Sequence, residues 1–144
     1  MLTVIRCMFV YLQLRWLIVL VDTRCRKNVI VGLYVCVDES IIPWDGRGMP
    51  FRKSLQRKPH DGWFFWSAAG NSKIFIALEV YDGTALEHQR EWTPEYGTTV
   101  GVPLRLTRHL HGSGRIVMGD KWFAWVPRRA VHLHGGRGCS VKDD

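Results

Sequence analysis

The sequence has 144 residues, of which 47% are hydrophobic, and it includes seven tryptophans. This composition excludes a disordered chain and predicts one domain with a buried core. Lys and Arg number 20 against 13 acidic residues, and the formal net charge of +7 favours an anionic partner such as nucleic acid or a membrane surface. The four cysteines include no C-x-x-C pair, so we expect reduced intracellular thiols rather than a zinc knuckle or a disulfide framework.

The N-terminal stretch MLTVIRCMFVYLQLRWLIVLVDTRC is strongly apolar. A membrane-spanning helix needs about 20 consecutive apolar residues, whereas Arg6, Gln13 and Arg15 interrupt this run. No small-residue cleavage site follows, as a signal peptide would require. We therefore expect residues 1–28 to form a core helix or a pair of strands rather than a membrane anchor. A further hypothesis is that this segment is not native to the domain that follows.

Three strands are predicted in the first half of the remaining chain. VIVGLYVCV (29–37) is a continuous β-branched run that is typical of a buried central strand, and Asp38 follows it. WFFWSAA (63–69) and KIFIALEVY (73–81) form the two arms of a hairpin, joined by the tight turn GNS (70–72).

A polar connection separates this hairpin from the remaining elements. A helix is predicted over 100–110, with Thr98 or Thr99 as its N-cap and Val102, Leu106 and Leu110 on one face. RIVMG (115–119) is a short buried strand, and a last helix is predicted over 127–134.

Two of the predicted strands, 29–37 and 115–119, are followed directly by an aspartate. The helical connection between them makes a parallel arrangement plausible, and parallel neighbours would bring Asp38 and Asp120 together at one sheet edge. Two converging carboxylates repel each other unless a cation lies between them, and oxygen ligands suit Mg²⁺ or Mn²⁺. The sequence therefore predicts a divalent metal site, with about 5–8 Å between the two carboxylates. The alternative is that Asp120 is an ordinary turn or helix-capping aspartate.

Two groups of basic residues are candidates for contacts with DNA phosphates. The first lies in the loop IPWDGRGMPFRKSLQRKPHDG and the second follows Val126. A solvated basic surface is the alternative interpretation of both groups. The candidate nucleic-acid-binding residues are Arg47, Arg52, Lys53, Arg57, Lys58, Arg128 and Arg129.

Four motifs follow one another along the chain: V-D-E-S with a following G-R, K-P before the hairpin, H-G-S-G-R, and D-x-W-F with V-P just after it. Together they resemble the transposase domain of piggyBac elements and their domesticated derivatives. The resemblance covers residues 29–138, preceded by the apolar segment 1–28, which lacks it, and followed by a polar tail at 139–144.

The resemblance implies an α/β, ribonuclease H-like mixed sheet flanked by helices and incomplete at the C-terminus. It also implies a DDE cut-and-paste DNA transposase that uses Mg²⁺ in the nucleus, with DNA rather than a small molecule as its substrate. The first family aspartate lies in the V-D-E-S motif, which is Asp38 here, and the second lies in the D-x-W-F motif, which is Asp120 here.

The third catalytic aspartate of the family lies far beyond the second, past another core strand. Asp143 and Asp144 lie in a polar tail with no strand leading into it, so neither is expected to replace that aspartate. Lys121 places a cation next to Asp120, where it would compete with a metal. We therefore expect a truncated, inactive transposase, or alternatively a non-catalytic basic module that binds DNA or a protein partner. The oligomeric state is left open.

Overall fold

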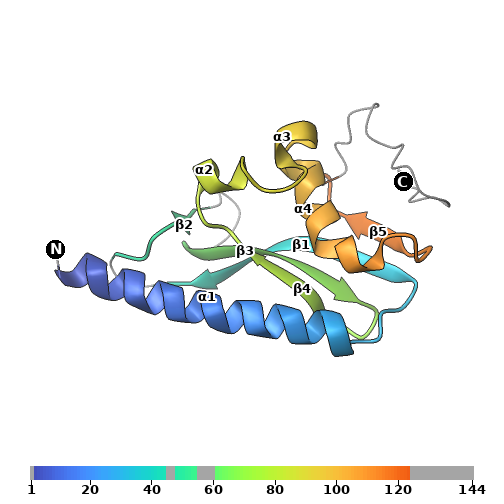
Figure 1. The fold of residues 1–144 in the computed structure, drawn as a ribbon, viewed down its shortest axis with the longest axis horizontal. Helices are drawn as coiled ribbons and strands as arrows, with labels where there is room; N and C mark the ends of the chain where they lie inside the picture. The colour runs from blue at the N-terminus through green and yellow to red at the C-terminus, as the bar shows by residue number, and fades with distance from the viewer. Residues whose placement is uncertain (1, 45–47, 55–60, 124–144) are drawn as a thin grey trace.

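The computed structural model describes residues 2–44, 48–54 and 61–123 (Figure 1). A long N-terminal helix precedes a five-stranded sheet, and three short helices lie between the fourth and fifth strands. In chain order the elements are α1 (Leu2–Asn28), β1 (Tyr34–Pro43), β2 (Arg52–Lys53), β3 (Gly62–Gly70), β4 (Phe75–Val80), α2 (Thr84–Glu87), α3 (Thr93–Tyr96), α4 (Thr98–Thr107), the 3₁₀ helix η1 (Arg108–Leu110) and β5 (Ile116–Gly119).

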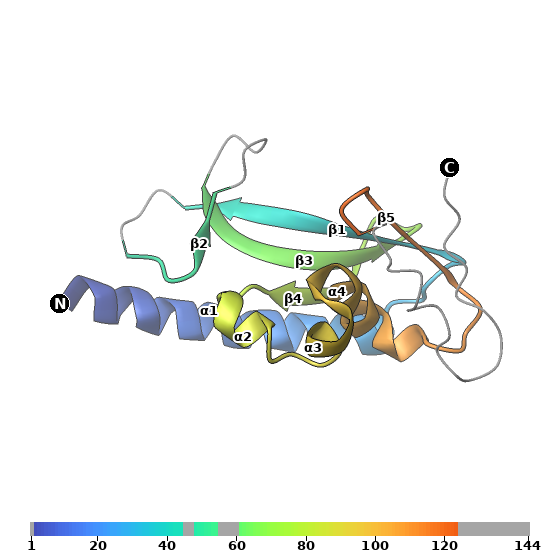
Figure 2. The same ribbon diagram turned by 90° about the horizontal axis from the view of Figure 1, so that it is seen from above.

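The sheet is mixed, curled and centred on the pair β1 and β3 (Figures 1 and 2). These two strands run antiparallel, whereas β1 and β5 run parallel. Both β4 and β2 pair antiparallel with the other side of β3. The predicted hairpin and the predicted parallel pairing of the first and last strands are thus confirmed, as is a mixed sheet flanked by helices. On the outer side of β5, the described residues place no further strand.

The predicted bounds of the first strand, 29–37, were wrong. β1 begins at Tyr34 and continues through Asp38 to Pro43. It continues because every residue from Val35 onward pairs with a residue of β3, and this ladder outweighs the low strand propensity of two acidic residues. Asp38 therefore lies within a long strand rather than after its end.

One hydrophobic core lies between the sheet and α4. Val35 and Val37 of β1 are fully buried there, together with Trp66 of β3. Val102 and Leu106 of α4 are likewise fully buried, as their spacing predicted. The side chains of Val35 and Val37 point into this core, whereas those of Tyr34, Cys36 and Asp38 on the opposite face of β1 are exposed.

The predicted threonine N-cap of α4 was wrong. Gly97 occupies the N-cap position with a φ of 81°, and no side chain caps the helix. Such a positive φ is accessible to glycine at little cost, whereas a threonine there would be strained. The helix consequently begins at Thr98, two residues earlier than predicted.

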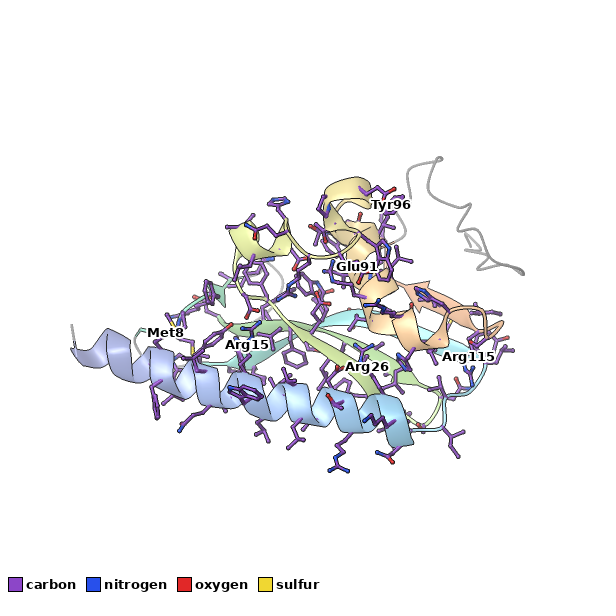
Figure 3. The ribbon with its side chains drawn as sticks, viewed as in Figure 1. Met8, Arg15, Arg26, Glu91, Tyr96 and Arg115 are labelled. Carbon is purple, nitrogen blue, oxygen red and sulfur yellow. The ribbon has the colours of Figure 1, made fainter. Side chains whose placement is uncertain are left out.

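The apolar N-terminal segment forms the helix α1, which runs along the β4 side of the sheet (Figures 1 and 2). The carboxylate of Asp22 accepts a hydrogen bond of 2.7 Å from the backbone N–H of Leu78 in β4, and so satisfies a group at the sheet edge. Tyr11 is buried in a second cluster with Trp63 and Val80. Arg15 and Arg26 also extend from α1 towards the rest of the molecule (Figure 3). A helix rather than a pair of strands is thus confirmed for this segment. The expected burial in the core is not, because Tyr11 is the only buried residue among the α1 side chains that the structure describes. Among the residues that the structure describes, no helix combines the length and hydropathy that crossing a membrane requires.

The outer face of α1 is also apolar. Phe9, Leu12, Trp16 and Leu20 recur at the three- and four-residue spacing of one helical stripe, and Trp16 is 77% exposed. Contiguous apolar surface of this kind is uncommon on monomeric proteins. We name these four residues the outer stripe of α1.

We expect the outer stripe to cause concentration-dependent self-association. The double substitution Trp16→Lys and Leu20→Lys should lower the average mass measured by sedimentation velocity at micromolar concentration, because it places two charges in the stripe. Ile30→Lys is the matched control, since Ile30 is 93% exposed but lies outside the stripe. Equal behaviour of the wild-type chain and the double variant would contradict this prediction.

Candidate metal centre

The parallel pairing of β1 and β5 brings three acidic residues together. The last registered pair is Val37 with Gly119, so Asp38 and Asp120 are the next residues on their respective chains. One carboxylate oxygen from each of Asp38, Glu39 and Asp120 lies within 4.8 Å of the others. Asp38 and Asp120, which the sequence predicted to meet, are therefore neighbours.

Backbone groups orient both aspartates. The Oδ1 atom of Asp38 accepts a hydrogen bond of 2.8 Å from the N–H of Glu39. The Oδ1 atom of Asp120 accepts one of 3.0 Å from the N–H of Trp122. Each carboxylate retains a second oxygen that can bind a cation. No cation of the described residues forms an ion pair with either aspartate, and Lys121 is exposed.

The turn after β5 fixes the position of Asp120. The N–H of Phe123 donates a hydrogen bond of 3.0 Å to the carbonyl oxygen of Asp120, and the Phe123 ring is buried in the core. A Cβ atom on Gly119 would lie 2.8 Å from the Cβ atom of Phe123. The G-D-K-W-F stretch thus combines a glycine that permits close approach with an aromatic anchor, and the aspartate lies between them.

Sequence reasoning assigned only Asp38 and Asp120 to this site, and it named Glu39 and Asp45 only as acids that would complete the site if the chain proved active. Successive side chains of a strand point to opposite faces, which argues against two consecutive residues sharing a site. However, β5 ends at Gly119, so on the β5 side of β1 the described chain places no strand beside Glu39. The adjacent acids in V-D-E-S were the only sequence feature that pointed to a third carboxylate. Whether Glu39 could reach the cluster depended on where β5 ends.

The aspartates also influence a nearby thiol. Cys36 is exposed on the same face of β1 as Asp38. Burial of its sulfur raises the pKa of Cys36, and the negative charges of Asp38 and then Asp120 raise that pKa further.

We expect Asp120→Asn to accelerate alkylation of Cys36. Removing the charge of Asp120 lowers the pKa of the thiol and so increases the thiolate fraction at mildly alkaline pH. The measurement is the iodoacetamide reaction rate in a background where the other three cysteines are serine, and Asp61→Asn is the remote control. An unchanged rate would contradict the electrostatic coupling of these groups.

Comparisons with known proteins identify the family. A profile of the family described as Transposase IS4 matches residues 11–134. This chain belongs to that family.

A solved structure supports the same assignment. The cryo-EM structure of the piggyBac transposase synaptic complex with hairpin DNA superposes with a TM-score of 0.53 at 27% sequence identity. The match covers 71% of this chain and 20% of that chain. The comparison with curated proteins found no match. The predicted resemblance to piggyBac transposases is therefore confirmed.

A DDE transposase family implies the use of a divalent metal, and the residues present fit this requirement. The acidic cluster offers three hard carboxylate oxygens within 4.8 Å of one another. Mg²⁺ and Mn²⁺ prefer such donors to nitrogen or sulfur. The metal ligands would be the carboxylates of this cluster, which lie within β1 and directly after β5.

Two of the predicted DNA-binding residues lie in the described structure, and both are engaged. Arg52 forms an ion pair of 2.8 Å with Asp61. The Nζ atom of Lys53 lies 4.4 Å from the ring centroid of Phe64 and 4.6 Å from that of Tyr81. Arg47, Arg57, Lys58, Arg128 and Arg129 lie outside the described residues, as does the predicted helix 127–134. The DNA contacts stay a prediction.

A buried ion-pair network attaches the connecting helices to β4. Arg105 of α4 contacts Glu79 at 2.7 Å and Glu87 at 2.5 Å. Arg90 contacts Glu79 at 2.7 Å and Asp82 at 2.8 Å. This network fixes α4 against β4, and α4 shares one core cluster with Val35 and Val37, the buried residues of β1 that precede the acidic cluster.

Proposed function

We propose that this chain is part of the catalytic core of a piggyBac-like DDE transposase, in which Asp38 and Asp120 hold a divalent metal ion. The observation that carries this proposal is the parallel register of β1 and β5, which brings the two carboxylates together. The family profile and the likeness to a transposase–DNA complex support DNA as the substrate. The site of action would then be nuclear DNA.

The residues of the chain would each have a defined part in this function. Asp38 lies on a continuous strand and supplies a rigid ligand, whereas Asp120 is held by the turn to Phe123. When bound, a divalent metal activates the attacking oxygen and stabilises the leaving oxygen in phosphodiester cleavage. The two aspartates would orient the ion. Both are exposed, so a phosphate backbone can approach the cluster from the solvent side.

We further propose that these 144 residues alone do not cleave DNA. Two-metal catalysis requires ligands that hold both ions about 4 Å apart. The chain spans 20% of the transposase chain that it matches. The resemblance to piggyBac transposases implies that the third catalytic aspartate lies beyond the motif of Asp120. We also propose that the transposase-related domain comprises 29–138 together with α1, because the family profile begins at residue 11 and α1 contributes Tyr11 to a core cluster.

Metal binding and DNA cleavage test the two parts of this proposal separately. Asp38→Asn and Asp120→Asn should each weaken Mn²⁺ binding by tenfold or more in a titration followed by electron paramagnetic resonance of free Mn²⁺, because each removes a charged ligand. Strand cleavage of DNA carrying transposon ends should be absent with either Mg²⁺ or Mn²⁺. Metal-dependent cleavage that both substitutions abolish would contradict the proposed inactivity and retain the proposed site.

A second candidate function is a non-catalytic module that binds DNA through its basic residues. The formal net charge of +7 favours it. This function needs neither aspartate, so Asp38→Asn and Asp120→Asn should leave DNA affinity unchanged or slightly increased, since each removes a negative charge. Weakened DNA binding in both variants would favour a metal-dependent interaction instead.

A further inference from the structure

We propose that Glu39 is a third carboxylate ligand, so that one divalent ion is held by Asp38, Glu39 and Asp120. This inference rests on the proposed function, because it concerns the same metal. It adds a residue that stands beside the family aspartate in V-D-E-S and that the two-aspartate interpretation does not include. The carrying observation is that an oxygen of Glu39 lies within 4.8 Å of oxygens from both aspartates.

The local sheet geometry explains how consecutive residues can serve one ion. Asp38 and Glu39 leave β1 on opposite faces and pair with Ser67 and Trp66 of β3 on the other side. Among the residues that the structure describes, no strand pairs with the β5 side of β1 beyond Val37, because β5 ends at Gly119. Carboxylates from both faces can therefore meet around this open edge, and the chain supplies Asp120 at the same point. The longer side chain of glutamate suits the ligand that must reach around the strand.

The chemistry of the cluster favours a bound cation. The carboxylates of Asp38 and Asp120 repel each other at this separation, and a divalent ion between them removes this repulsion. Neither aspartate has a cationic partner among the described residues. Mg²⁺ keeps several waters when one or two carboxylates bind it, and a third carboxylate should strengthen binding by roughly tenfold through added charge.

The test is Mn²⁺ titration of the full 144-residue chain with four single substitutions. Glu39→Gln preserves the size of the side chain and should weaken Mn²⁺ binding about fivefold to twentyfold, and Glu39→Ser should weaken it to the same extent. Asp38→Asn shows how much Mn²⁺ affinity is lost when one of the two family aspartates is neutralised. Glu95→Gln is the matched control, because Glu95 is exposed on α3 and outside the cluster, and it should bind like the wild type.

A second measurement separates metal binding from folding. For each variant, the Mn²⁺-induced rise in melting temperature is compared with that variant's own metal-free value, so a lower starting stability does not affect the result. Wild-type affinity in both Glu39 variants, together with weak binding by Asp38→Asn, would overturn the role of Glu39 and leave the proposed function standing. Unchanged binding in all of the variants would overturn both.

Discussion

Arg105→Ala should destabilise the folded chain by about 3–5 kcal/mol, because it removes one of the two arginines that neutralise the buried carboxylates of Glu79 and Glu87. The Arg105 side chain is 11% exposed, and its partner Glu87 is 4% exposed. The Arg105 guanidinium also donates to the hydroxyl of Thr93 at 2.6 Å and to the carbonyl oxygen of Glu91 at 2.9 Å. The measurement is the free energy of unfolding from urea denaturation.

The control is a second arginine of the same segment. Arg108 pairs with Glu91 at 2.9 Å, but these side chains are 65% and 48% exposed. Exposed ion pairs contribute about 0–1 kcal/mol, so Arg108→Ala should change stability little. Similar losses for the two variants would show that the buried network does not attach α4 to the sheet as inferred.

Glu87 gives this network a pH dependence. Burial raises the pKa of Glu87, and the positive charges of Arg105 and Arg90 only partly oppose that rise. Because its folded-state pKa lies above the unfolded value, the contribution of Glu87 is fully present below the unfolded pKa and is lost as pH rises through the folded pKa. Between these two pKa values the wild-type chain should lose stability as pH rises, and Glu87→Gln should remove part of that loss. At neutral pH, Glu87→Gln should lower the free energy of unfolding far less than Arg105→Ala does.

Replacing four loop residues by alanine should flatten the salt dependence of DNA binding. Each phosphate contact contributes a slope of roughly −0.9 in log affinity against log salt, so losing several contacts weakens binding most at low salt. The four substitutions are Arg52→Ala, Lys53→Ala, Arg57→Ala and Lys58→Ala, measured by fluorescence anisotropy on duplexes of unrelated sequence.

Two double variants locate the effect within the loop. Arg52 and Lys53 already have partners in Asp61 and the Phe64 ring, so the Arg52→Ala, Lys53→Ala pair should account for less than half of the flattening seen with all four substitutions, and the Arg57→Ala, Lys58→Ala pair measures the remainder. Arg24→Ala with Lys27→Ala removes the same charge from exposed positions on α1. If this control pair has the same effect as the loop pairs, net charge rather than the loop determines binding.

Much of the sheet could be predicted because local patterns and pairing agreed. The alternation of 73–81 and the small residues at 70–72 specified a hairpin, and the structure contains it as β3 and β4. The meeting of Asp38 and Asp120 followed from two apolar strands joined through a helix, an arrangement that favours parallel neighbours. Prediction was weaker for the N-terminal segment. Because its sequence is apolar on every side, the hydrophobic pattern did not show whether it forms a helix or strands.

The sequence by itself determined the hairpin of β3 and β4, the buried face of α4 and the family to which the motifs belong, because these depend on short-range periodicity and on residues close together in the chain. It did not predict β2, which lies in a segment expected to be a loop. Only the tertiary structure decided that β1 continues past Asp38 and that Glu39 joins the acidic cluster. The first depends on pairing with β3, and the second on the position at which β5 ends. The partners of Arg105 were likewise decided at this level, because Glu79 lies 26 residues away and the two meet only when α4 packs on β4.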